Sequence, residues 1–133
     1  MKLQRVERLP KDRFVVPLRK ADEATRTMRE CLATRRFNSA GTEAIQAVIS
    51  SCDALTIFHL GLRSTGQSHL DVLQLLGGIP LEGIGPLRRQ AESVLELKSH
   101  VQYEVRVVEE AVARKMVLQA ERVYDWTVKH TGP

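Results

Sequence analysis

The stretch that decides the fold is residues 38–60, NSAGTEAIQAVISSCDALTIFHL. Apolar side chains occupy most positions around a helix built from this stretch, which predicts a helix that is buried on nearly all sides. Asn38 or Ser39 is expected to cap its first turn, because both side chains accept hydrogen bonds from exposed amides. Gly61 is expected to end it. A helix this apolar needs neighbours on several sides, so the sequence indicates a bundle with residues 38–60 at its centre.

Further helices flank the central one. Residues 18–36 carry apolar side chains at three- and four-residue spacing, and residues 68–76 predict a short helix. Residues 87–129 contain neither Gly nor Pro, yet a single helix of that length would be about 60 Å long, too long for a compact domain. A break is therefore expected near residues 104–108, where β-branched valines cluster. The sequence predicts an all-α fold, an antiparallel four- to five-helix up-and-down bundle.

Positive charge is concentrated at one end of the chain, whose 133 residues fit one domain. The first twenty residues contain seven basic and two acidic side chains, whereas the rest contain 13 basic and 14 acidic ones. Pro10 and Pro17 interrupt this region, and residues 13–16 between them are expected to be extended. We expect a basic N-terminal arm over residues 1–17, which either contacts phosphates or an acidic surface or is simply solvated. One bundle domain is expected over residues 18–130.

Several classes of protein are disfavoured by the sequence. No apolar run approaches the roughly 20 residues that span a membrane, and the first residues do not resemble a secretory signal. Cys31 and Cys52 each lie in a helical apolar pattern, which indicates reduced core cysteines in a cytoplasmic protein. No metal-ligand spacing and no Gly-rich phosphate loop is present, so neither a metal nor a cofactor is expected.

Three stretches carry a resemblance to a known family. Residues 36–58 combine small residues with an early Asn, and residues 63–76 form a loop and short helix containing His69. Residues 97–123 contain a basic residue, a Tyr a few positions on, and then a helix rich in Glu and Ala. Together they resemble the HEPN superfamily, helical domains often found beside minimal nucleotidyltransferases or in toxin–antitoxin pairs. The resemblance implies a four- or five-helix bundle, frequently a homodimer, with a possible nucleotidyltransferase-type partner.

The resemblance also suggests a reaction. Many members of the superfamily are metal-independent ribonucleases with an Arg-x(4–6)-His motif, and Arg63 and His69 have this spacing. Histidine can move a proton to or from a ribose hydroxyl, and arginine can stabilise charge on a phosphate in the transition state. The family motif usually lies just before the last helix, where this chain has His100 and Arg106 in the reverse order. A ribonuclease with Arg63 and His69 as catalytic residues is therefore an alternative hypothesis.

The main hypothesis is a non-catalytic HEPN-like helical module that binds a nucleotide, a nucleic acid such as RNA, or a nucleotidyltransferase-type partner. The expected binding residues are Arg36, Asn38, Lys98 and Tyr103, bordering one polar groove. The ordinary alternative is a solvated Lys98 and a packed Tyr103 with its hydroxyl at the edge. A purely structural interaction bundle is the third hypothesis.

Overall fold

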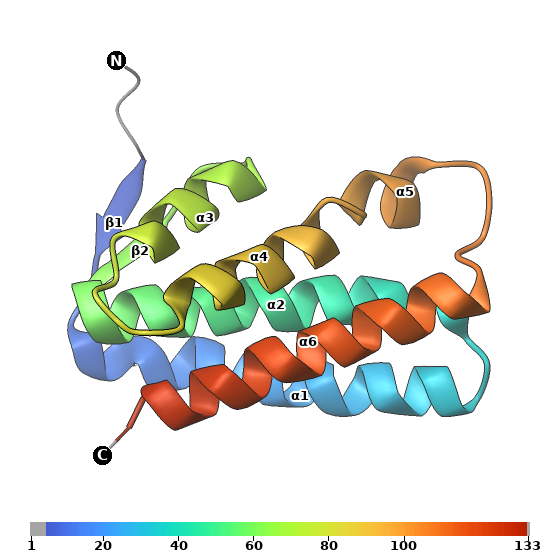
Figure 1. Ribbon diagram of the computed structural model, residues 1–133, viewed down its shortest axis with the longest axis horizontal. Helices are drawn as coiled ribbons and strands as arrows, with labels where there is room; N and C mark the ends of the chain where they lie inside the picture. Colours follow the sequence, from blue (N-terminus) through green and yellow to red (C-terminus); the bar gives the residue numbers. More distant parts are fainter. Residues whose placement is uncertain (1–4, 133) are drawn as a thin grey trace.

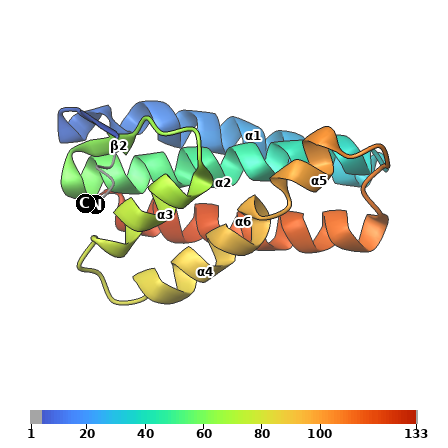
Figure 2. The same ribbon diagram turned by 90° about the horizontal axis from the view of Figure 1, so that it is seen from above.

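A computed structural model describes residues 5–132 of the chain. Within that range the elements, in chain order, are β1 (Val6–Arg8), η1 (Lys11–Phe14), α1 (Val15–Ala33), α2 (Phe37–Leu60), β2 (Leu62–Ser64), α3 (His69–Gly77), α4 (Ile84–Leu95), α5 (Lys98–Tyr103) and α6 (Glu110–His130). Helices α1, α2, α4 and α6 run alternately up and down along one axis, with α3 and α5 beside them (Figures 1 and 2). The predicted all-α up-and-down bundle is confirmed. None of the helices in residues 5–132 has the length and apolar character needed to cross a membrane.

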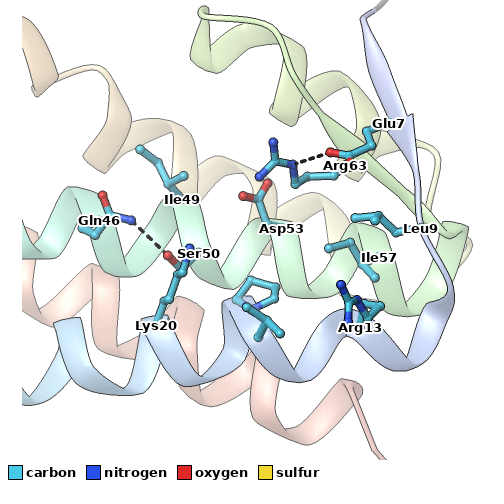
Figure 3. A pocket seen from close by; sticks show the side chains of 12 residues that line it. Glu7, Leu9, Arg13, Lys20, Gln46, Ile49, Ser50, Asp53, Ile57 and Arg63 are labelled. Atoms are coloured by element: carbon cyan, nitrogen blue, oxygen red, sulfur yellow. Dashed lines mark hydrogen bonds and ion pairs between the residues drawn. The ribbon is translucent and has the colours of Figure 1, made fainter.

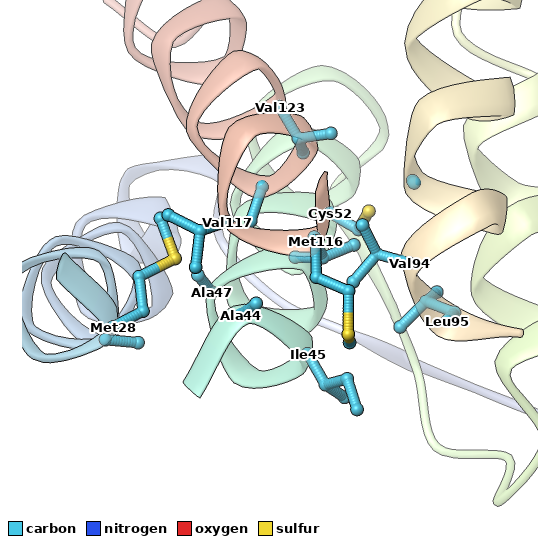
Figure 4. Close-up of a cluster of buried hydrophobic side chains, with 14 of the residues drawn as sticks. Met28, Ala44, Ile45, Ala47, Cys52, Val94, Leu95, Met116, Val117 and Val123 are labelled. Atoms are coloured by element: carbon cyan, nitrogen blue, oxygen red, sulfur yellow. The ribbon is translucent and has the colours of Figure 1, made fainter. Parts of the chain in front are cut away.

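Helix α2 is the central helix of the bundle, as its sequence predicts. It contacts α1, α6, α4, α3 and α5, because small residues on several of its faces allow neighbouring helices to approach. Gly41 illustrates this packing: a Cβ there would lie 3.3 Å from a methyl carbon of Val101 and 3.5 Å from the sulfur of Met116. Figure 4 shows part of the resulting core, which draws on four helices through Met28, Ala44, Ile45, Ala47, Cys52, Val94, Leu95, Met116, Val117 and Val123.

The two ends of α2 test the predicted caps. The helix ends at Gly61, which has a left-handed φ of 66°, so the predicted stop is confirmed. The predicted N-terminal cap is wrong, because α2 begins at Phe37 and no side chain caps it. Asn38 instead donates a hydrogen bond from Nδ2 to the Val101 carbonyl (3.4 Å) and accepts one at Oδ1 from the Val108 amide (3.1 Å). The side chain thus holds the end of α5 and the loop before α6.

The N-terminal segment packs against the bundle instead of remaining separate from it. Strand β1 pairs antiparallel with β2, and the Leu9 amide donates to the Gly61 carbonyl at 2.9 Å. The expectation of extended backbone at residues 13–16 is wrong, because η1 and the first turn of α1 include them. Proline is tolerated in a first helical turn, where its missing amide has no helical partner. The Phe14 ring also packs edge-on against Phe58 of α2, with ring centroids 4.9 Å apart.

The predicted loop that begins at residue 63 is also partly wrong, since Leu62–Ser64 forms strand β2. Its partner β1 lies within the predicted basic arm. Residues 1–4 of that arm, including Lys2, lie outside the described residues. The division of the chain into an arm over residues 1–17 and a bundle over 18–130 stays a prediction.

The C-terminal half contains the predicted break. Helix α5 ends at Tyr103 and α6 begins at Glu110, and a second break separates α4 from α5. Helix α4 starts after Gly83, whose φ is 91° and where a Cβ would lie 3.3 Å from Nε1 of Trp126. In the loop before α6, Val108 is buried against the core.

Candidate functional site

A pocket of about 310 Å³ lies where the N-terminal segment crosses α2 (Figure 3). Its walls come from β1, η1, the start of α1, one face of α2, and β2. The lining residues are Glu7, Leu9, Arg13, Val16, Pro17, Lys20, Gln46, Ile49, Ser50, Asp53, Ile57 and Arg63. The pocket therefore combines an apolar lining with charged side chains of both signs.

One face of α2 supplies the floor of this pocket. Ile49, Asp53 and Ile57 follow one another at four-residue spacing, so they lie along one side of the helix. Gln46 and Ser50 lie beside them, and the Gln46 amide donates to the Ser50 hydroxyl at 3.1 Å. Polar side chains thus lie beside the two isoleucines on this face of a helix that is otherwise largely buried in the core.

Asp53 is the acidic group on this floor, and its environment alters its protonation. Burial of the carboxyl group raises the pKa of Asp53 to about 6, although the nearby charges of Arg63 and Lys20 oppose this rise. Arg63 extends over Asp53 toward Glu7 (Figure 3), and its Nε lies 3.5 Å from a Glu7 carboxylate oxygen. Asp53 thus changes charge near pH 6 while cations surround it.

A second, smaller pocket of about 140 Å³ adjoins the first. It is bounded by the loop after β2, the start of α3 and the start of α5, and its lining residues are Ile49, Asp53, Ser64, Gly66, Gln67, Ser68, His69, Val72 and Lys98. Because Ile49 and Asp53 line both pockets, the two lie next to each other along α2, and we call them together the α2 groove. Two of the predicted site residues, His69 and Lys98, meet in the second pocket, and Arg63 lies in the first.

The loop at the second pocket is fixed by local hydrogen bonds. Ser68 caps α3, because its hydroxyl accepts a hydrogen bond from the Leu70 amide at 3.2 Å. The Gly66 amide donates to the Ser64 hydroxyl at 3.3 Å. His69, the first residue of α3, thereby lines the same pocket as Asp53.

Two other predicted binding residues lie elsewhere. Arg36 and Asn38 line a third pocket of about 270 Å³, together with the loop residues Val107 and Val108. Asn38 uses its side chain to hold that loop, and Arg36 donates from Nε to the Thr34 hydroxyl at 3.0 Å. The structure therefore groups Lys98 with the α2 groove and not with these two residues.

Tyr103 lies outside these three pockets. Its side chain is 75% exposed at the end of α5, followed by exposed Val105 and Val107. His100 and Arg106 both hydrogen-bond to Glu104, and these contacts lower the pKa of the Glu104 carboxyl group. His100 and Arg106 are the two residues that this chain has, in reverse order, where the family motif usually lies. They are thus joined through the Glu104 carboxylate at the surface.

Sequence reasoning missed Asp53, Arg13 and Lys20 as residues of the site. The available signal for Asp53 was the series Gln46, Ser50 and Asp53, whose spacing of four and three residues places three polar side chains on one face of a largely apolar helix. Among residues 5–132, no group of three or more His, Cys, Asp or Glu side chains is arranged to hold a metal ion.

Comparison with known proteins places this architecture in a family. No curated protein matches the chain. The family model described as HEPN domain matches residues 16–131, nearly the whole chain, and includes α2, the α3 start and Lys98. This match covers the bundle and most of the α2 groove, and the chain belongs to the HEPN domain family.

Proposed function

We propose that this HEPN domain binds a nucleotide, either free or as one unit of an RNA, in the α2 groove. The charge of the groove carries the proposal. Its two pockets contain more basic than acidic side chains: Arg13, Lys20, Arg63 and Lys98 against Glu7 and Asp53. An excess of cations in a concave site favours a phosphate-bearing ligand.

The apolar part of the groove supports the same proposal. Leu9, Val16 and Ile49 line the first pocket and offer contact to the flat face of a base. Its volume of about 310 Å³ is at the lower end of ligand pockets, which span roughly 300–1,000 Å³. A groove of this size suits one nucleotide unit. The family assignment agrees with a nucleotide ligand, because HEPN domains often have functions related to nucleotides or RNA.

Equilibrium binding tests the proposal directly. Titration calorimetry with nucleoside monophosphates and a short single-stranded RNA would compare the wild type with the double variant Lys20→Gln/Lys98→Gln. We expect the double variant to bind at least about tenfold more weakly, and wild-type RNA affinity to fall with salt. Lys115→Gln is the matched control, because Lys115 is exposed on α6, outside the lining of the groove. Absence of wild-type binding, or equal loss in the control, contradicts the proposal.

One observation favours a second candidate function, a metal-independent ribonuclease. Arg63 and His69 line neighbouring pockets, with Asp53 common to both. An imidazole there is placed to exchange a proton with a ribose hydroxyl, and a guanidinium to stabilise phosphate charge. We rank binding without catalysis first, because the two side chains line separate pockets. Cleavage of a mixed RNA pool in EDTA that disappears in His69→Ala would reverse this order.

We also propose that the domain forms a homodimer. The alternative is that it assembles with a nucleotidyltransferase-type partner. The proposed contact is the exposed apolar segment Tyr103, Val105 and Val107 after α5, and HEPN domains often dimerise. Light scattering would measure the mass of the wild type and of Val105→Ser/Val107→Ser. A dimeric wild type that the substitution converts to monomer supports this contact, whereas a monomeric wild type at high concentration contradicts the homodimer.

A further inference from the structure

The position of Asp53 restricts the kind of base that the groove can accept. Asp53 lines both pockets, and Ile49 and Ile57 of the same helix face lie on either side of it. A base that packs its face against Ile49, one helical turn from Asp53, therefore turns its polar edge toward the carboxylate. An ionised carboxylate has only hydrogen-bond acceptors, so it requires donors on that edge.

We propose that the α2 groove selects guanine nucleotides, with the Asp53 carboxylate accepting hydrogen bonds from N1–H and the 2-amino group of guanine. This inference rests on the proposed function. Guanine presents these two donors side by side. Adenine and cytosine instead present one donor beside an unprotonated ring nitrogen, and uracil presents one donor between two carbonyl oxygens. Each of the other bases thus turns at least one acceptor toward the carboxylate, leaving buried lone pairs without a partner.

The surrounding charges exclude another ligand with adjacent donors. A guanidinium group also offers two neighbouring N–H groups to a carboxylate. It is positively charged, however, and Arg13, Lys20 and Arg63 line the same pocket as Asp53. A neutral base on a phosphate-bearing ligand fits this charge pattern, whereas a cation does not.

The second pocket supplies a place for the phosphate. It lies on the other side of Asp53 and contains Lys98 and His69, while most of the apolar lining belongs to the first pocket. A guanine in the first pocket and a phosphate beside Lys98 therefore use both halves of the groove. The basic side chains are then divided between them, with Arg13 and Lys20 near the base.

The selectivity depends on the charge of Asp53 and hence on pH. Burial raises the pKa of Asp53 to about 6, so the carboxylate is ionised at pH 7.5 and mostly protonated at pH 5. A protonated carboxyl group has one donor beside one acceptor, a pattern that matches adenine. The guanine preference is thus expected at pH 7.5 and lost at pH 5. The charged and titratable groups that line the groove with Asp53 are Glu7, Arg13, Lys20, Arg63, His69 and Lys98.

The test compares GMP, IMP and AMP, three nucleotides that share a purine ring and a phosphate. Calorimetric titration at pH 7.5 is expected to give GMP about 10- to 100-fold tighter binding than AMP, the range of a good bidentate base contact. IMP keeps N1–H and lacks the 2-amino group, so its affinity is expected between the two. Because histidine side chains change charge between about pH 5 and 8, the pH 5 measurement is repeated in His69→Asn.

Two variants separate recognition of the base by Asp53 from the effect of removing one negative charge anywhere on the protein. Asp53→Asn replaces two acceptors with one donor and one acceptor, and is expected to reverse the preference toward AMP. Asp125→Asn makes the same change on an exposed side chain of α6 and is expected to leave the GMP preference intact. Equal binding of GMP and AMP, or a preference that survives Asp53→Asn, overturns the guanine assignment while the proposed nucleotide site stands. Failure of the wild type to bind any of the three overturns both.

Discussion

Replacing Asp53 with Asn is expected to stabilise the fold at neutral pH. Asparagine has nearly the same shape and carries no charge at any pH. In the wild type, burial disfavours the ionised form of Asp53 more strongly than Arg63 and Lys20 favour it, so its pKa rises to about 6. Ionisation therefore costs more in the folded chain than in the unfolded chain, and the neutral amide avoids this cost.

The size of the effect follows from the two pKa values. An ordinary aspartate has a pKa of 3.8, compared with about 6 for Asp53 in the folded protein. At about 1.4 kcal/mol per pH unit, the difference of about two units corresponds to a destabilisation of about 3 kcal/mol by the ionised group. Below pH 3.8 both states are protonated and the penalty is absent. It grows between pH 3.8 and 6 and is complete above pH 7.

Urea unfolding followed by circular dichroism would measure this dependence at several pH values between 4 and 7.5. The quantity of interest is the free energy of unfolding of Asp53→Asn minus that of the wild type. We expect this difference to rise by about 2–3 kcal/mol from pH 4 to pH 7.5. Taking the difference removes contributions from carboxylates common to both proteins. The measurement is made without ligand, because a ligand bound to the folded state adds its own stabilisation.

A difference that stays constant across this pH range would refute the reasoning, because it would mean that the groove solvates Asp53 as well as water does. Asp125→Asn serves as the control, since its exposed side chain on α6 loses little hydration on folding. Its difference from the wild type is expected to stay constant. A rise in both variants would place the cause in the overall charge of the chain and not in the burial of Asp53.

Three further predictions concern the packing of the bundle. Leu55→Ala should lower the free energy of unfolding by about 2–5 kcal/mol in urea titration, because this side chain is fully buried in α2. Asn38→Ala removes both hydrogen bonds to the loop before α6; it should cost about 1–3 kcal/mol and speed hydrogen exchange at the Val108 amide. Gly83→Ala should lower the melting temperature, because φ is 91° there and the Trp126 indole lies against the new Cβ. Gly77→Ala, which meets nothing within 4 Å, should leave the melting temperature unchanged or raise it.

The bundle was predictable because its core follows helical periodicity. In α2, apolar and small residues occupy nearly every position, and this pattern alone specifies a central helix. Gly61 marks the end of α2 for a local reason, its left-handed backbone. The N-terminal cap of α2 was predicted wrongly because the Asn38 side chain forms tertiary hydrogen bonds with Val101 and Val108. Local capping preference could not reveal partners more than 60 positions away.

The groove was less predictable, since it depends on a segment without a strong pattern. Strand β1 has three exposed residues, and its pairing with β2 joins positions far apart in the sequence, such as Val6 and Ser64. Only this pairing brings Glu7 and Arg63 together above Asp53. Motif spacing singled out His69 and the family resemblance singled out Lys98, but neither could tell that the two residues line the same pocket. The site residues that were missed come from separate segments, with Asp53 on α2, Arg13 on η1 and Lys20 on α1.

The third hypothesis, a purely structural bundle, accounts poorly for Asp53. The neighbouring positions on the same helix face are Ile49 and Ile57, so an aliphatic side chain at position 53 would continue the apolar floor. The chain instead has a half-buried carboxyl group there, and its burial raises the pKa of Asp53 to about 6. Carboxyl groups with a strongly shifted pKa in concave sites are typical of functional positions. A bound ligand that donates hydrogen bonds to the carboxylate stabilises its ionised form, which burial in the folded protein disfavours. A structural role predicts that ligands leave the stability difference between Asp53→Asn and the wild type unchanged. A binding role predicts that GMP narrows this difference by stabilising the wild type more than the variant.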